Sequence, residues 1–282
     1  METALETLSE QAREGDKKAL EELVKSIQDR IYGLSIRMLY YPADAEDATQ
    51  EILIKIITHL DRFRGESRFI TWAYRIASNH LISTRKRRAE RWGWTFEIYE
   101  QGVDEGLAYP GEASFDEPEK ELLVEEMRLA CMQGMLLCMK RETRIVYILG
   151  EIFGFTGMEG SEILNITPET FRQRLSRGRK KLRDFMDRKC SLFNPDNPCR
   201  CERQIACDIE KRRLIDPEHL LFAVHPCHAR QNEDAVNGLD EIREMLRIAM
   251  LFRRQPEYAA PDDFAGIVKQ MVDSGKINIL LN

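Results

Sequence analysis

The chain has 282 residues and a formal net charge of −6, with 42 basic and 48 acidic side chains. This length excludes a single small core and fits two or three domains, and the net charge excludes the uniformly basic surface common in DNA-binding proteins. The charges are segregated, however, because basic residues dominate positions 62–91 and acidic residues dominate positions 97–121. Such asymmetry indicates more than one partner, one of them anionic.

The N-terminal residues and the cysteines bear on the compartment. The first residues lack the charged start and apolar core of a signal peptide, and no apolar run approaches the roughly 20 residues of a membrane span. We therefore expect a cytoplasmic protein without a membrane span. The seven cysteines are then expected to be reduced, metal-bound or redox-sensing, and not to form a disulfide framework.

Two helices are predicted within the first sixty residues. Apolar residues recur at helical spacing from Leu20 to Leu39, and Pro42 is predicted to end this helix because proline disfavours helical geometry in the residue before it. Asp44 is a suitable cap for a second helix that runs to Leu60. The outer side of this second helix carries four polar residues, here called the acidic face: Asp44, Asp47, Gln50 and Glu51.

A polar loop and a third helix follow. Gly65 permits a tight turn, and Ser67 is predicted to cap a helix that runs into a basic cluster at 85–88. Arginines that pair with phosphates and aromatic rings that stack on bases suit single-stranded DNA. Burial in the core is the alternative for Phe69 and Trp72. The candidate DNA-contacting residues are Arg64, Glu66, Ser67, Arg68, Phe69, Trp72, Arg75, Asn79 and Lys86.

The middle of the chain passes from a linker to a helix-turn-helix. Glycines and acids with little periodicity predict an acidic linker over 92–115. Asp116 with Pro118 restarts a helix, another is expected over 144–153, and the helix-turn-helix follows over 155–182. No strand pattern appears, so we predict an all-α fold that ends in a mostly helical, cysteine-containing extension.

The second helix of the helix-turn-helix is strongly basic. In such motifs the early residues of this helix meet base edges in the major groove, where arginine pairs with guanine and glutamine with adenine. Phe171 and Leu175 are predicted to point inward. The candidate base and phosphate contacts are Glu169, Thr170, Arg172, Gln173, Arg174, Ser176 and Arg177.

The order and spacing of these motifs resemble the group-four, or extracytoplasmic-function, sigma factors of bacterial RNA polymerase. The resemblance rests on Asp44–Glu51, on Phe63–Ser67 with Trp72 and Asn79, and on Thr170–Leu182. It implies a protein that binds core RNA polymerase through the acidic face, reads a −10 promoter element with residues 64–86, and reads a −35 element with the helix-turn-helix. The resemblance also implies that the protein requires no cofactor.

The resemblance also implies a domain layout. A region 2-like domain is expected over 10–91 and a region 4-like domain over 116–186, with the acidic linker over 92–115 between them. Within the family this linker threads near the RNA exit path, although a plain flexible linker accounts for its composition equally well. Residues 187–282, here called the extension, lie beyond the minimal layout of the family.

Two residues of the helix-turn-helix depart from the family pattern. Gly160 occupies a position that usually buries an apolar side chain, and glycine costs about 1 kcal/mol of helix stability against alanine. We expect Met158 to repack the gap, or the domain to be looser than usual. Asn165 stands where the turn glycine is usual, which is a mild change because asparagine tolerates a left-handed conformation.

The cysteines of the extension leave three interpretations open. Their thiols, with His225, Cys227 and His228 downstream, are suitable ligands for tetrahedral zinc, although the spacing is not that of a standard zinc knuckle. A thiol redox pair and plain buried cysteines are the other two. The candidate metal ligands are Cys190, Cys199, Cys201 and Cys207.

The extension is expected to regulate the protein, in place of or alongside a separate anti-sigma factor. We expect it to fold back on one or both DNA-binding domains. The main alternative function is a helix-turn-helix repressor or activator that works without polymerase, but such a protein needs neither the acidic face nor the loop and helix over 64–79. No nucleophile–base pair or phosphate-binding glycine loop appears, so an enzyme is not expected.

Overall fold

The computed structural model describes residues 2–85, 87–111, 115–211, 213–225, 227–228, 248–260 and 263–275. The predicted all-α fold is confirmed, because β structure in these ranges is limited to one pair of two-residue strands and an isolated bridge. The elements are α1 (Glu2–Arg13), α2 (Lys17–Leu39), α3 (Pro42–Thr58), η1 (Leu60–Arg62), α4 (Phe69–Ser83), η2 (Ala89–Trp92), α5 (Phe96–Ala108), α6 (Glu117–Leu137), α7 (Arg141–Tyr147), the π-helical turn η3 (Ile148–Ile152), α8 (Gly157–Leu164), α9 (Pro168–Lys189), α10 (Cys201–Lys211), β1 (Cys227–His228), β2 (Glu257–Tyr258) and α12 (Phe264–Asp273).

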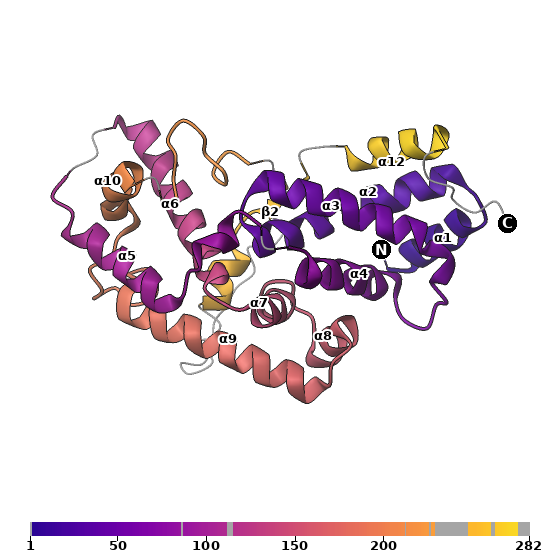
Figure 1. Cartoon of the computed structure of the whole chain (residues 1–282), viewed down its shortest axis with the longest axis horizontal. Coiled ribbons are helices and arrows are strands. Elements are labelled where there is room, and N and C mark those ends of the chain that lie inside the picture. Colours follow the sequence, from indigo (N-terminus) through magenta and orange to yellow (C-terminus); the bar gives the residue numbers. More distant parts are fainter. Residues whose placement is uncertain are drawn as a thin grey trace.

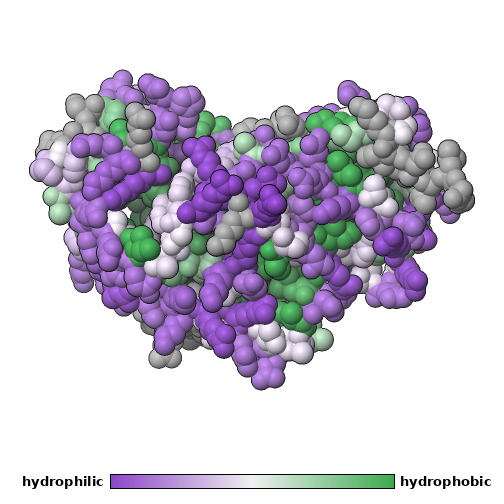
Figure 2. Space-filling model, viewed as in Figure 1, coloured by the Kyte–Doolittle hydropathy of each residue, from purple (hydrophilic) through white to green (hydrophobic). Residues whose placement is uncertain are grey.

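The helices form two groups that touch along one side. Figure 1 shows α1 to α4 together at one end of an elongated molecule, with α5, α6 and α10 at the other end. Helices α7, α8 and α9 lie along the lower side and bring α8 against α4. Figure 2 shows that this view of the surface is mostly hydrophilic, with apolar residues in small separate areas.

The α1–α4 group forms because apolar residues at helical spacing face one core. Leu23, Ile27 and Ile31 of α2 are fully buried there. Two predicted caps are wrong. Helix α3 begins at Pro42, so Asp44 lies in its first turn. Helix α4 begins after Arg68, so Ser67 does not cap it, and the Oε1 atom of Glu6 accepts the first N–H, from Phe69, at 3.0 Å.

The segment predicted to have little regular structure contains helix α5. The hydroxyl of Thr95 caps this helix, and Phe96 and Tyr99 are buried against Phe185 of α9, with ring centroids 5.8 and 5.6 Å apart. Helix α10 packs on the other side, where a side chain on Gly106 would lie 1.9 Å from the amide oxygen of Gln204. The expectation of an irregular linker is therefore wrong between 96 and 108, because these apolar residues find partners far away in the sequence.

A buried ionic network joins the two groups. Arg144 of α7 is 3% exposed and donates to the backbone oxygens of Leu136 and Met139, both at 3.0 Å, and its Nη1 lies 3.3 Å from Oε1 of Glu90. Arg141 forms a second ion pair with the same carboxylate. Burial lowers the pKa of Arg144 to about 10. Because Arg141 and Arg144 of α7 both pair with Glu90, this network connects the segment after α4 to α7.

The extension packs on both groups. The buried carboxylate of Glu126, on α6, accepts the backbone N–H groups of Leu221, Phe222 and Ala223 at 2.8, 2.9 and 2.7 Å. Residues 248–253 are helical, and within them the ring of Phe252 lies 5.6 Å from that of Tyr147 on α7.

Further contacts tie the extension to α2. Arg37 of this helix donates to the backbone oxygen of Pro256 at 3.1 Å. Helix α12 packs along α2, with Lys269 paired to Glu21 at 2.9 Å. The expectation that the extension folds back on the rest of the chain agrees with this geometry. The extension therefore bridges the two helical groups.

Asp208 of α10 makes the packing of the extension sensitive to pH. Burial raises the pKa of this carboxyl from 3.8 to about 6, while its Oδ1 accepts the N–H of Leu214 at 2.7 Å. The folded chain therefore holds the proton more tightly than the unfolded chain, so the associated stability is full below about pH 4 and is lost as the pH rises through 6. Asp208→Asn is expected to raise the free energy of unfolding at about pH 7 by up to about 3 kcal/mol. Thermal unfolding at about pH 7 and about pH 4 checks this, since an equal gain at both values contradicts it.

Candidate nucleic-acid interface

The acidic face lies on α3, beside the chain that leaves α4. The guanidinium of Arg87 faces all three carboxylates, at 4.0 Å from Asp44, 3.8 Å from Asp47 and 3.6 Å from Glu51. The side chains of Asp47 and Glu51 are 67% and 53% exposed, and Gln50 is half-buried. Exposed pairs at such distances contribute little free energy. Because three carboxylates face one guanidinium, the acidic face keeps a net negative charge, and a basic partner can reach it.

The loop before α4 surrounds a polar hollow. Arg64 and Glu66 are exposed, Ser67 is half-buried, and all three line the hollow together with Trp72 and Arg75. Gly65 has a φ of 70°, which places it in the left-handed region that the predicted tight turn requires. The loop therefore presents hydrogen-bonding groups around a space open to solvent.

The aromatic residues under the loop divide into core and surface. Phe69 is fully buried, and its ring lies 5.4 Å from Phe63 and 5.7 Å from Trp72. Its position contradicts a base-stacking role in this structure, because no face of the ring reaches solvent. Trp72 is only half-buried and lines the hollow. Phe69 therefore supports the loop, and Trp72 keeps a surface for stacking.

Helix α8 covers part of the predicted single-strand contacts. Arg68 forms an ion pair with Glu159 of α8. Arg75 donates from Nε to the backbone oxygen of Glu162 at 3.2 Å and lies 3.6 Å from its carboxylate. Apolar contacts accompany these polar ones, since the ring of Tyr74 lies 5.1 Å from that of Phe155. Asn79 stays exposed, and Lys86 lies outside the described residues.

The helix-turn-helix has the predicted form. Asn165 adopts a left-handed conformation with a φ of 50°, and the hydroxyl of Thr167 caps α9, whose first residue is Pro168. Phe171 is fully buried, as predicted, whereas Leu175 is half-buried. The early part of α9 has an exposed face made of Glu169, Arg172, Gln173, Ser176 and Arg177, with Thr170 and Arg174 half-buried beside it.

The glycine at position 160 has a packing reason. A side chain on Gly160 would lie 2.2 Å from the ring of Phe171, so glycine allows this ring to pack directly on α8. Met158 does not fill the gap, because it is 69% exposed. The expectation that Met158 repacks this position is therefore wrong. The larger aromatic side chain on α9 takes the space.

Glu159 is a site residue that sequence reasoning missed. Its carboxylate forms a capping box with Thr156, accepting the backbone N–H of that residue at 2.8 Å, and it also pairs with Arg68. These interactions lower the pKa of Glu159, the hydrogen bond from the Thr156 backbone most of all. The capping box is readable from the Thr-x-x-Glu spacing. The pairing with Arg68 has no sequence signal, because it joins residues far apart in the chain.

The cysteines of the extension do not form a metal site among the described residues. No group of three or more His, Cys, Asp or Glu side chains gathers there in positions that suit a metal ion. Cys190 and Cys199 form a backbone bridge, whereas Cys207 is buried in the core. Burial raises the pKa of Cys199 to about 11 and of Cys201 to about 12. The side chains of Cys227 and His228 lie outside the described residues, so zinc binding stays a prediction.

Comparisons with known proteins identify two segments of the chain. Residues 23–91 match the family model of Sigma-70 region 2, and residues 129–182 match that of Sigma-70, region 4. The chain is 32% identical over 184 residues to the ECF RNA polymerase sigma factor SigW of Bacillus subtilis, covering 65% of this chain and 97% of that protein. It is 30% identical over 182 residues to the ECF RNA polymerase sigma-E factor of Escherichia coli K12, covering 63% and 91%.

A solved structure of CnrH in complex with the cytosolic domain of CnrY is also similar, with 23% identity, a TM-score of 0.43 and coverage of 65% of this chain and 97% of that one.

The chain belongs to the extracytoplasmic-function (ECF) sigma factors. Members of this family are transcription initiation factors and not enzymes. The matched segments leave the extension outside. In the described part of the chain, no helix is long and apolar enough to cross a membrane.

Proposed function

We propose that this sigma factor directs core RNA polymerase to specific promoters and that its extension holds it in a closed, inactive arrangement. The acidic face of α3 binds the polymerase. The loop over 64–68 and helix α4 read the −10 element, and α9 reads the −35 element. The region 2-like domain over 10–91 and the region 4-like domain over 116–186 thus bind DNA at two places. The extension acts in place of, or alongside, an anti-sigma factor.

The contact between α4 and α8 carries the proposal. Arg68 and Arg75, both expected to contact DNA, are engaged by Glu159 and Glu162 of the other DNA-binding domain. Elements centred at −10 and −35 are about 25 base pairs apart, or roughly 85 Å at 3.4 Å per base pair. Domains in direct contact cannot read both elements at that separation. The domains must therefore move apart before the protein engages a promoter.

The extension opposes that movement. It is anchored on α6 through Glu126, on α7 through Phe252 and on α2 through Arg37. Because these three helices belong to both DNA-binding domains, separation of the domains breaks at least one anchor. Removing the extension is therefore expected to favour the open arrangement and promoter binding.

A charge reversal on α8 tests the closed arrangement. Glu162→Lys places a cation beside Arg75, which replaces an attraction by a repulsion and is expected to increase promoter binding of the full-length holoenzyme several-fold. Glu142→Lys, at an exposed position in the first turn of α7, is the control for the general attraction of an added cation to DNA. Gel-shift titration with core polymerase measures both. Equal increases for the two variants contradict the proposal.

Run-off transcription on a random-promoter pool tests the function itself. The full-length chain and a chain that ends at residue 189 are each combined with core polymerase. Promoter-specific transcripts are expected from both, with more from the shorter chain. Absence of specific transcripts from both chains overturns the proposed function, and equal yields overturn the role of the extension.

A further inference from the structure

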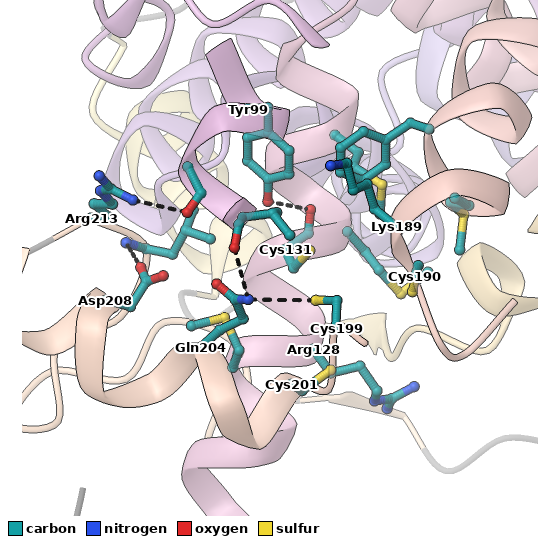
Figure 3. Close-up of a pocket in the computed structure, with 18 of the residues that line it drawn as sticks. Tyr99, Arg128, Cys131, Lys189, Cys190, Cys199, Cys201, Gln204, Asp208 and Arg213 are labelled. Carbon is teal, nitrogen blue, oxygen red and sulfur yellow. Dashed lines mark hydrogen bonds between the residues drawn. The ribbon is translucent and has the colours of Figure 1, made fainter. Parts of the chain in front are cut away.

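A cavity lies where the extension meets the region 4-like domain. It has a volume of about 240 Å³, and its walls come from α5, α6, the end of α9, the following loop and α10. Figure 3 shows Tyr99, Cys131 and Gln204, from three different helices, around the same space. None of the residues expected to contact DNA or polymerase lines it. The cavity is therefore separate from the interfaces described above.

The walls of the cavity are rich in sulfur. Four methionines and four cysteines line it: Met127, Met132, Met135, Met186, Cys131, Cys190, Cys199 and Cys201. Burial raises the pKa of each of these thiols above its ordinary value. In the absence of a metal, raised pKa values keep these groups in the thiol form, which packs as a small apolar group.

The cations at the edge of the cavity are already neutralised. Lys189 pairs with Asp104 at 2.7 Å, and Arg213 and Arg128 form ion pairs with Glu105 and Glu125. An anionic ligand would have to compete with these carboxylates. Asp208 is the other acidic group of the lining, and its Oδ1 already accepts the N–H of Leu214 at 2.7 Å. The rest of the cavity offers a polarisable surface without an unpaired cation.

We propose that this cavity binds a neutral aromatic molecule. Methionine and cysteine sulfurs make favourable contacts with aromatic rings, and the walls also present the rings of Trp94, Tyr99 and Phe185. A cavity of about 150 Å³ in another protein accommodates benzene, so this larger space fits a fused two-ring molecule of about ten non-hydrogen atoms. Ile98 and Leu192 line the cavity and are 48% and 41% exposed, which places them at its mouth.

Binding strengthens the attachment of the extension. The cavity exists only while α10 and the 190–201 loop lie against α5 and α6, so a ligand stabilises that packed form by an amount that grows with its concentration relative to Kd. Under the proposed function, such a ligand keeps the sigma factor closed. This consequence rests on the proposed role of the extension, whereas the binding site itself does not.

Fluorescence titration of the full-length chain with aminonaphthalene, a neutral two-ring fluorophore, tests the site. The expected result is saturable binding at one site per chain, with emission shifted to shorter wavelength. Leu192→Glu places a charge at the mouth and is expected to weaken binding at least tenfold. Leu122→Glu is the matched control, because Leu122 has a similar exposure of 38% but does not line the cavity. Non-saturable binding, or equal weakening by both variants, overturns the site.

A cavity-filling variant gives a second test. Cys131→Phe adds a ring to the α6 wall and is expected to abolish binding while the circular dichroism stays native; binding that persists in the folded variant overturns the site. If this variant does not fold, the comparison of Leu192→Glu with Leu122→Glu still tests the site. The ligand is also expected to raise the melting temperature of the wild-type chain, and no rise overturns its effect on the extension. These measurements contain no polymerase or DNA, so their failure is distinct from failure of the proposed function.

Discussion

Glu126→Ala is expected to release the extension and to raise promoter-specific transcription by the full-length protein several-fold. The carboxylate is fully buried and accepts three consecutive backbone N–H groups, from Leu221, Phe222 and Ala223. Alanine leaves these donors without an acceptor, at about 1–3 kcal/mol each when they stay buried. Detachment of the segment lets water satisfy them, so the variant shifts the chain towards the open arrangement. Run-off transcription with equal amounts of core polymerase measures the gain.

Glu125→Ala is the matched control for this variant. Glu125 is the neighbouring residue, its side chain is 41% exposed, and it pairs with Arg128 one helical turn away. Such surface pairs contribute about 0–1 kcal/mol, so transcription is expected to stay at the wild-type level. A gain in the control that equals the gain in Glu126→Ala would show that the anchoring hydrogen bonds do not restrain the protein.

Arg144→Met is expected to cause the largest loss of stability of any substitution considered. It leaves Glu90, whose side chain is 6% exposed, without one of its two arginine partners, and it removes donors from the backbone oxygens of Leu136 and Met139. Breaking a buried ion pair by removing one partner costs about 3–5 kcal/mol. The melting temperature is expected to fall by roughly 6 °C or more.

Calorimetry of Arg144→Met and of Arg183→Met separates the network from a general effect of losing an arginine. Arg183 is 42% exposed and lies 3.9 Å from Asp184, so its replacement is expected to change the melting temperature little. The double variant Glu90→Gln/Arg144→Met is expected to recover none of the loss, because Glu90 stays paired with Arg141 in the single variant and glutamine would deprive Arg141 of its carboxylate partner. A small loss in Arg144→Met would mean that the network does not join the two domains.

The sequence predicts the local parts of this protein well. The acidic face, the tight turn at Gly65 and the left-handed residue Asn165 follow from helical spacing and from the conformations that these residues accept. Family membership, which the comparisons establish, was likewise visible in motif order. Each of these features depends on residues that are close together in the chain.

The parts that could not be predicted depend on contacts between distant segments. Helix α5 contains two glycines and several acids, and it depends on contacts with distant segments, such as those of Phe96 and Tyr99 with Phe185. For Phe69 the sequence leaves base stacking and burial both open, and the packing of α1, α4 and η1 buries it. Arg68 and Glu159 are 91 positions apart in the chain, and a single sequence contains no pattern that predicts such a contact.

Helix α5 also limits how far apart the two DNA-binding domains can travel. Its 13 residues span about 20 Å as a helix at 1.5 Å per residue. The same residues reach about 43 Å when extended at 3.3 Å per residue. Unwinding α5 therefore lengthens the tether by about 23 Å, or roughly seven base pairs of duplex at 3.4 Å each. Under the proposed function, a less stable α5 would therefore let the two domains bind promoter elements separated by a longer spacer, and a more stable α5 would favour shorter spacers.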